Sequence, residues 1–402
     1  MRAIRSWAPF VLSAVLLSAC GGGDPAVPGT GSTAGAPSTK GSFTAVVSFG
    51  DSLSDIGAYS PATSLAGTGA PPYFGGKFTT NDTTNGAPTA TPLGKVWVEN
   101  LAATLGLVVT PAEVGFGASS VKCPAAAVPA LAATCTAYGQ GGSRVTDPNG
   151  IGHAGGALTV PVVTQIANHL AHFGSFKASD LVFVYGGNND VFTQFGAFTT
   201  AAAGIQASAA AGTISSDEAN RQLFAAQTAA QAAMKQAAQD EVELIKSQIL
   251  GKGGKYVAVM TLSDIGDTPF GNSLPASVKP VLTQLSEIFN LWLRDGLTAQ
   301  PVQIIDTFAI FKDGYANPAK YGIVNNTVPA CDAAKISAIT GGRVTDGSSL
   351  FCNATPGAPY NGIRTGADVT TWQFADSVHP TTGGHKIISD TFTAQIRAFG
   401  WI

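Results

Sequence analysis

Residues 46–57, "VVSFGDSLSDIG", join an apolar run to a cluster of hydroxyl and carboxylate side chains. The run at residues 44–49 lacks strict alternation of apolar and polar positions, which is typical of a strand covered on both faces. In open α/β sheets, ligands bind at the carboxyl ends of the strands. Ser52 follows directly after this run, so it is a candidate for chemistry. The alternative is that it caps the start of a helix.

The same strand pattern recurs along the chain, with helical apolar spacing between the strands. Further strands are predicted at 181–185, 256–262 and 302–306. Helices are predicted at 95–105, 160–173 and 216–250, and a last one by the apolar stripe Ile388, Phe392, Ile396 and Phe399. The third helix has a capping-box start at Ser215 and Glu218 and is expected to end at Gly251. This alternation predicts a three-layer α/β/α sandwich with a mainly parallel central sheet.

Segments rich in Gly, Pro, Thr and Ala interrupt this pattern, and we expect them to be loop insertions. They are residues 60–92, 110–155, 194–214 and 312–370. The sequence has no internal repeat and no sign of a second-domain boundary after residue 43. Residues 43–402 are therefore predicted to form one domain.

Composition limits the class of partner. The 402 residues are 45% hydrophobic and 12% charged, with a net charge of −3 and no basic run. Such a chain can bury a large core, but it lacks the positive charge that holds a nucleic acid. We expect no nucleic-acid partner, and we expect a monomer.

The N-terminal segment has the pattern of an export signal. Arg2 and Arg5 precede an apolar stretch at residues 7–17 that is too short for a permanent membrane span. It leads into "LSAC", which ends at Cys20 and resembles a bacterial lipoprotein signal.

Residues 1–19 are therefore predicted to be a lipoprotein-type signal and Cys20 to carry lipid. The alternative is an ordinary signal with an incidental cysteine. Residues 20–42, rich in Gly, Pro, Ser and Thr, are predicted to be a flexible tether. We expect export from a bacterial cell, as an outer-membrane lipoprotein or a secreted protein, with the lipid as the sole membrane attachment.

Four further cysteines, an even number in an exported chain, predict disulfides. They are Cys123, Cys135, Cys331 and Cys352. Of the three pairings that four cysteines allow, we favour the local one, Cys123–Cys135 and Cys331–Cys352, because it closes two short loops. A metal site is disfavoured, since no pair has C-x-x-C spacing and no histidine lies near either pair in sequence.

Polar residues also follow two other predicted strands. "YGGNND" (185–190) follows one strand and "SDIGD" (263–267) follows another. In "FADSVHPTTGGH" (374–385), Asp376 precedes His379 by three residues. A histidine that acts as a general base needs an acceptor for its other ring nitrogen, and an aspartate on the same turn can supply it.

Four short segments thus occur in a fixed order: Gly50-Asp51-Ser52-Leu53, the Gly-Gly pair of "YGQGGSRV", Gly187-Asn188-Asn189-Asp190, and Asp376-x-x-His379. Their order resembles that of the SGNH hydrolases, also called GDSL lipases and esterases, over most of residues 43–399. "VWVENL" and "NPAKYG" resemble the bacterial secreted lipase, esterase and phospholipase branch of that family. No G-x-S-x-G elbow, H-E-x-x-H motif or P-loop competes with this interpretation.

The resemblance implies a role for each matching residue. Ser52 would be the nucleophile, His379 its general base and Asp376 the group that orients the imidazole. The oxyanion hole would consist of the backbone N–H groups of Ser52 and Gly142 and the side chain of Asn189.

Some alternatives stay open at these positions. The family's usual asparagine upstream of the glycine pair is Ala137 here, which leaves the support of the glycine turn open. Asn189 has a helix cap as its alternative role. His385 is the alternative general base.

Other polar residues are assigned structural roles. Side-chain hydrogen bonds that hold loops are expected of Asp51, Asp55 and Asp190. Positions in a loop or on the polar face of a helix are expected of His153, His169 and His172.

The resemblance implies an exported serine esterase or lipase that forms an acyl-enzyme on Ser52 and needs no metal or organic cofactor. Its substrate would be an acyl ester or a lipid. Within the same family, an acyltransferase or a phospholipase is the alternative. A catalytically silent surface-binding lipoprotein is a further alternative, which the retained Ser52, Asn189, Asp376 and His379 argue against.

Overall fold

The computed structural model describes residues 33–63, 75–82, 94–355 and 360–402. The predicted signal at residues 1–19 and the predicted lipidation site Cys20 lie outside these ranges, so both stay predictions.

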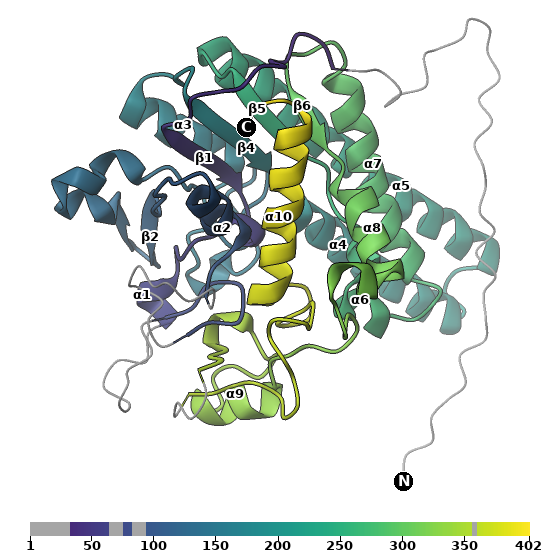
Figure 1. Ribbon diagram of the computed structural model, residues 1–402. Coiled ribbons are helices and arrows are strands. Elements are labelled where there is room, and N and C mark those ends of the chain that lie inside the picture. Colours follow the sequence, from purple (N-terminus) through teal and green to yellow (C-terminus); the bar gives the residue numbers. More distant parts are fainter. Residues whose placement is uncertain (1–32, 64–74, 83–93, 356–359) are drawn as a thin grey trace, which may run out of the picture.

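A parallel four-stranded sheet forms the centre of the fold (Figure 1), with the strand order β1-β4-β5-β6. The strands are β1 (Ala45–Gly50), β4 (Asp180–Tyr185), β5 (Tyr256–Met260) and β6 (Gln303–Ile305). Gly50 pairs with Tyr185, so the polar segments after β1 and β4 begin at the same edge of the sheet. The predicted strands and their parallel arrangement are confirmed.

Helices cover both faces of the sheet and complete the three predicted layers. The helix on one face that is nearest the viewer in Figure 1 is α10 (Thr382–Ala398), and α2 (Trp97–Thr104) packs beside it. The helices of the opposite layer are α3 (Val162–Phe173), α4 (Asn188–Ala210), α5 (Ser216–Leu244) and α7 (Lys279–Gly296).

Strand β4 shows how two cores form on one sheet. Leu181 and Phe183 belong to the core under α2 and α10, whereas Val182 and Val184 belong to the core on the other face. All six residues of β4 are buried. Coverage on both faces therefore explains why the strands show no polar alternation in the sequence.

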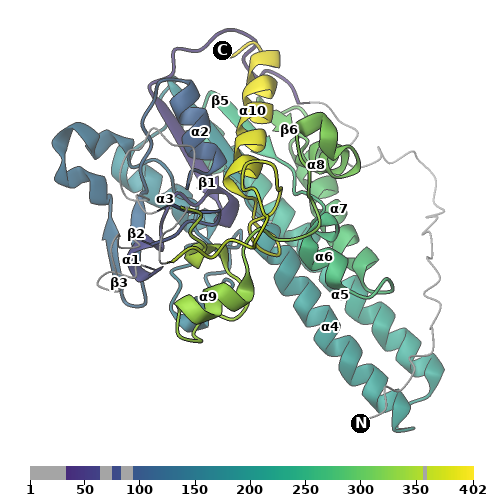
Figure 2. The ribbon, with the colours of Figure 1, turned by 60° about the horizontal axis from the view of Figure 1, so that its bottom comes forward.

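The segment 194–214 is not the loop insertion that we expected, because α4 continues through it to Ala210. Alanine is the strongest helix former, and small side chains let α4 pack closely on α5. The two helices form a long pair that extends away from the sheet (Figure 2). The end of α5 also differs from the prediction: π-helical and 3-10 turns follow it, and the chain turns at Gly253, with a φ of 98°, not at Gly251.

The other insertions hold short elements and both disulfides. These elements are α1 (Ser60–Thr63), the antiparallel strands β2 (Glu113–Phe116) and β3 (Ser119–Lys122), and α9 (Ala333–Ile339). The short helix α6 (Pro269–Ser273) lies outside the insertions, and α8 (Thr307–Ala316) follows β6 and runs into the last insertion. The cysteines pair as predicted, Cys123 with Cys135 and Cys331 with Cys352. Two disulfides indicate a protein that matures in an oxidising compartment outside the cytoplasm.

The described part of the predicted tether, residues 33–42, has no helix or strand. It is nevertheless attached to the domain, because Ala34 N–H donates to the Gln300 carbonyl at 3.0 Å and Gly41 N–H to the Trp401 carbonyl at 2.8 Å. The folded part thus includes residues that the sequence assigned to the tether. In the ranges that the structure covers, we find no helix with the length and apolar character needed to cross a bilayer.

Candidate active site

The end of β1 is held in a fixed conformation where it presents Ser52. Ser52 opens a short 3-10 helix, η1 (Ser52–Ser54), whose cap is the side chain of Asp51 and not Ser52 itself. The Gln165 side chain accepts from Gly50 N–H at 2.9 Å and donates to the Gly50 carbonyl at 2.7 Å. A Cβ at Gly50 would lie 2.4 Å from the Tyr185 carbonyl oxygen, so the close approach of β4 requires glycine there.

Ser52, His379 and Asp376 meet in one hydrogen-bonded chain. His379 Nε2 lies 2.9 Å from Ser52 Oγ, and His379 Nδ1 lies 2.9 Å from both carboxylate oxygens of Asp376. This arrangement suits an imidazole that donates from Nδ1 to the carboxylate and accepts the serine proton at Nε2. Residues that lie far apart in sequence thus form the geometry of a nucleophile, a base and an orienting acid.

The Asp376 carboxylate is held by several donors. Its oxygens accept from the backbone N–H groups of Ser349, Val378 and His379, at 2.8 to 3.0 Å. Burial on its own raises the pKa of Asp376, but the charge and hydrogen bond of His379 and these further donors outweigh it and hold the pKa well below its usual range. Asp376 is therefore ionised at neutral pH, as an orienting group must be.

The predicted oxyanion donors include two backbone N–H groups. The backbone N–H groups of Ser52 and Gly142 have no acceptor among the described residues, whereas the neighbouring Gly141 N–H is taken by Asp55 at 2.9 Å. Gly142 has a φ of 81°, and a Cβ there would lie 2.0 Å from the Ile151 carbonyl oxygen. Glycine is thus required at Gly142 by both backbone conformation and space.

Asn189 does not cap the helix that begins beside it. The cap position of α4 is Gly187, which has no side chain, and the Asn189 amide donates to the Ser143 carbonyl at 2.9 Å. An amide nitrogen carries two N–H bonds, so this contact fixes the side chain and leaves the second N–H for another acceptor.

Three aspartates hold the loops of the site, as the sequence predicts. Asp51 accepts from Asn188 Nδ2 at 2.9 Å, and Asp190 accepts from Val145 N–H at 3.0 Å and Arg144 Nε at 2.9 Å. Asp55 accepts the backbone N–H groups of Gly57, Ala58 and Gly141. Burial raises the pKa values of Asp51 and Asp55 to about 6.

Two histidines, His385 and His169, are buried, which excludes the positions or roles that the sequence suggested for them. His385 is fully buried, accepts from Trp97 N–H at 3.3 Å and contacts the Phe78 carbonyl at 3.2 Å, so both of its nitrogens are occupied and it is not the base beside Ser52. His169 does not lie on the polar face of its helix: it is buried, and its ring stacks on Phe176. Burial lowers the pKa of His385 to about 3 and that of His169 to about 4.

Sequence reasoning missed several supporting residues. Gln165 holds the strand end, Arg144 pairs with Asp190, and the Phe78 ring lies 4.7 Å from the His379 ring between centroids. Each of these side chains contacts a partner more than forty residues away in the sequence, so no local motif identifies it. His153 and His172 are exposed, as expected.

A mainly apolar pocket is lined by sequence neighbours of Ser52 and His379, although these two residues do not line it themselves. Leu53, which follows Ser52, and Val378, which precedes His379, line it together with Phe311, Ile323, Phe374 and Ile388. The predicted polar segment 263–267 contributes Ser263, Asp264 and Asp267 to the same pocket, and Asp264 pairs with Lys312 at 2.7 Å. Across the described ranges, no three His, Cys, Asp or Glu side chains gather into a metal-binding group.

Comparison with known proteins agrees with this geometry. A family model described as "GDSL-like Lipase/Acylhydrolase" matches residues 46–392. The chain is 30% identical over 153 residues to "Esterase EstA" of Pseudomonas aeruginosa, and likewise to "Esterase EstA" of Pseudomonas putida. The aligned stretch is 37% of this chain and 20% of each esterase, so the chain spans about a fifth of the length of these relatives.

Proposed function

Because the chain belongs to the GDSL-like lipase/acylhydrolase family, we propose that it is a serine hydrolase that cleaves carboxylic esters. The observation that carries this proposal is the hydrogen-bonded chain from Ser52 Oγ through His379 to Asp376, with 2.9 Å at each step. The esterase names of the two partial relatives support the same reaction class.

The proposed reaction has two halves. Ser52 Oγ attacks the ester carbonyl while its proton passes to His379 Nε2, and Asp376 stabilises the imidazolium that forms. The C–O bond then breaks, the leaving alcohol takes the proton from Nε2, and the acyl group stays on Ser52. A water molecule deacylates the enzyme through the same base and releases the carboxylic acid.

Negative charge on the carbonyl oxygen would be met by three hydrogen-bond donors. These are the N–H groups of Ser52 and Gly142 and the second N–H of Asn189. Each such donor contributes about 3–4 kcal/mol to the stability of the transition state.

A proposal for the substrate class is supported by the pocket that Leu53 and Val378 line. These two residues are the sequence neighbours of the proposed nucleophile and base, and the apolar lining favours an ester with an apolar acyl chain. Rates on nitrophenyl esters of increasing chain length separate an esterase, with a maximum at two to four carbons, from a lipase or phospholipase, with a maximum beyond about ten.

The decisive experiment is labelling with a fluorophosphonate probe. We expect the wild type to be labelled and Ser52→Ala to be unlabelled. Ser54→Ala is a matched control, since the Ser54 hydroxyl is buried two residues away without a partner among the described residues. Equal labelling of Ser52→Ala, or an unlabelled wild type, would reject the hydrolase and favour the silent binding protein.

Localisation forms a separate proposal. The signal-like residues 1–19 support export with a lipid on Cys20, which would leave the domain tethered at a membrane surface. Mass spectrometry of the mature N-terminus tests this, because a protein found free in the medium with Cys20 unmodified would have no lipid anchor.

A further inference from the structure

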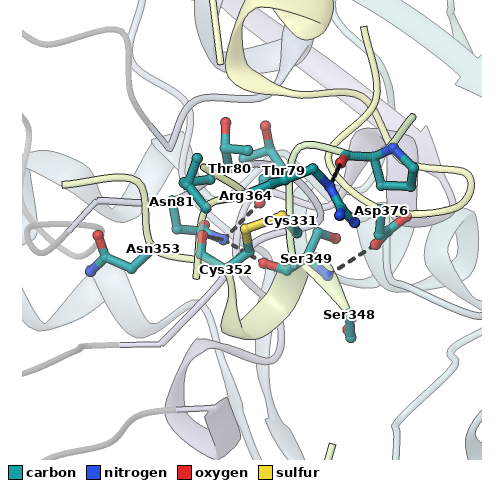
Figure 3. Close-up of a disulfide and its surroundings, with 12 residues drawn as sticks. Thr79, Thr80, Asn81, Cys331, Ser348, Ser349, Cys352, Asn353, Arg364 and Asp376 are labelled. Atoms are coloured by element: carbon teal, nitrogen blue, oxygen red, sulfur yellow. Dashed lines mark hydrogen bonds between the residues drawn. A yellow bond between two sulfur atoms is a disulfide. The ribbon is translucent and has the colours of Figure 1, made fainter. Parts of the chain in front are cut away.

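The Asp376 carboxylate receives one hydrogen bond from a distant part of the chain. Val378 and His379 donate from its own turn, but Ser349 N–H donates to Asp376 Oδ2 at 2.9 Å from 27 residues upstream. Figure 3 shows this contact beside the Cys331–Cys352 disulfide. Ser349 is fully buried, so water does not compete for the bond.

The disulfide ties both sides of this contact together. Ser349 opens the 3-10 helix η9 (Ser349–Phe351), and Cys352 N–H closes that turn on the Ser349 carbonyl at 3.0 Å. On the other side, Cys331 N–H donates to the carbonyl of Ala375, the residue before Asp376, at 2.8 Å. The sulfur–sulfur bond therefore links the segment that carries the donor to Cys331, which is itself hydrogen-bonded to the segment that carries the acceptor.

The apolar cluster around this contact is small. Its four buried members among the described residues are Cys331, Ile336, Cys352 and Ala375, of which two are the bonded cysteines, and the partly buried Val344, Phe351 and Ile363 pack against them. Asn81 adds a polar anchor, since its side chain donates to the Ser349 carbonyl at 2.8 Å and its N–H to the Cys352 carbonyl at 2.8 Å. With so small an apolar core, the covalent bond is a main constraint on the position of Ser349.

We propose that the Cys331–Cys352 disulfide is a positioning element for the Asp376 carboxylate, so that ester hydrolysis needs this bond in its oxidised form. The inference rests on the function proposed above. Reduction by a dithiol would transfer two electrons and two protons to the sulfurs and give two thiols and an oxidised dithiol. The turn that carries Ser349 would then lose its covalent link to Cys331, the residue that is hydrogen-bonded beside Asp376.

The second disulfide is the matched control. Cys123–Cys135 lies in the insertion that contains β2 and β3, where Cys123 N–H bonds to the Ala112 carbonyl and Thr110 Oγ1 to the Cys135 sulfur. Across the described residues, neither cysteine bonds to the serine, histidine or aspartate of the site. Its removal should lower stability without altering the geometry of Asp376.

The test compares the double variants C331A/C352A and C123A/C135A with the wild type. For C331A/C352A we expect kcat on a soluble nitrophenyl acetate to fall about 10- to 100-fold with KM unchanged, since a displaced catalytic group slows the chemical step and not binding. For C123A/C135A we expect kcat within about two-fold of the wild type and only a lower Tm. Equal kcat values in the two folded variants would overturn the inference.

A second pair of variants covers the case in which C331A/C352A does not fold. Ser349→Pro removes the N–H at the first helical position, where proline fits, and Ser348 before it has a ψ of 129°, which proline accepts. Ser348→Ala is the matched control, because it changes the neighbouring side chain and keeps both the Ser348 N–H, which donates to Asp346, and the Ser349 N–H, which donates to Asp376. We expect Ser349→Pro to lose kcat and Ser348→Ala to keep it; equal activity would overturn the inference.

A spectroscopic readout separates this inference from the proposed reaction. The His379 Nδ1 proton, shared with Asp376, should give a strongly downfield 1H NMR signal that is absent in His379→Ala. We expect this signal to shift or broaden in Ser349→Pro and to stay unchanged in C123A/C135A. A wild type that lacks hydrolysis would reject the proposed function, whereas an active wild type with an unperturbed signal in Ser349→Pro would reject the positioning role alone.

Discussion

Two buried carboxyl groups near the site have opposite surroundings. Asp376, 6% exposed, accepts from the His379 ring and from three backbone N–H groups. Glu241 on α5 is 0% exposed, and neither of its oxygens has a hydrogen-bond partner among the described residues. It lies against the turn after β4, where a Cβ on Gly186 would be 2.7 Å from Glu241 Oε2.

This difference sets the charge of each group. Burial dominates at Glu241, and the nearby charges of Asp190 and Asp51 add to it, so its pKa is raised well above the usual value and it is neutral. At Asp376 the same burial is outweighed by the imidazole and the hydrogen-bond donors, so the pKa is lowered. Burial disfavours the charged form of both carboxyl groups, and the hydrogen-bond donors decide whether the ionised form is nevertheless the stable one.

The largest effect should come from a substitution of Asp376, the carboxyl group that accepts several hydrogen bonds. Asp376→Asn keeps the shape of the side chain but removes the charge that stabilises the imidazolium and selects its tautomer, so kcat should fall about 10³- to 10⁴-fold. Steady-state rates on a soluble nitrophenyl ester measure this.

Glu241→Gln is the control for that experiment, because it makes the same acid-to-amide change at a group that is already neutral. Its kcat should stay within about two-fold of the wild type. If both amide variants lost activity equally, the contrast between the two carboxyl groups would be wrong.

A smaller effect should appear in the pH dependence of folding. The pKa of Asp376 is lower in the folded protein than its ordinary value of 3.8, so its ionised form stabilises the fold above about pH 4, and this contribution is lost as the pH falls through the folded-state pKa. Asp376→Asn should therefore be less stable than the wild type by about 3–5 kcal/mol at pH 7. The gap should narrow below pH 4 in urea unfolding, and a gap independent of pH would contradict the assignment.

Much of this arrangement could be predicted because its signals are local. The strand before Ser52, the Asp376–His379 spacing and the cysteine pairs are each short patterns, and the parallel sheet follows from strands buried on both faces. The structure then adds what no pattern contains, namely that these segments meet with hydrogen-bond distances of 2.9 Å.

The rest could not be predicted because it depends on contacts between distant segments. The extent of α4 was not predicted because Gly196 and Gly204 within it also suit a loop, and α7, which begins with Lys279-Pro280, was not recognised. The hydrogen bond of Ser349 and the burial of Glu241 both depend on residues that are distant in sequence, so no local pattern predicts them. In the sequence alone, Glu241 is an ordinary polar position of a long helix.

The smallest predicted effect concerns Glu241, the carboxyl group that accepts no hydrogen bond from the described residues. The pKa of Glu241 is raised by folding above its ordinary value of 4.5, so the stability linked to its proton is fully present below pH 4.5 and is lost as the pH rises toward the folded-state pKa. Glu241→Gln cannot ionise, so it should match the wild type near pH 4 and exceed it above pH 4.5, by up to about 1.4 kcal/mol for each pH unit. Urea unfolding at pH 4, 6 and 8 measures the gap. Because the slope is opposite in sign to that of Asp376→Asn, parallel pH profiles for the two variants would show that the donors do not decide the charge.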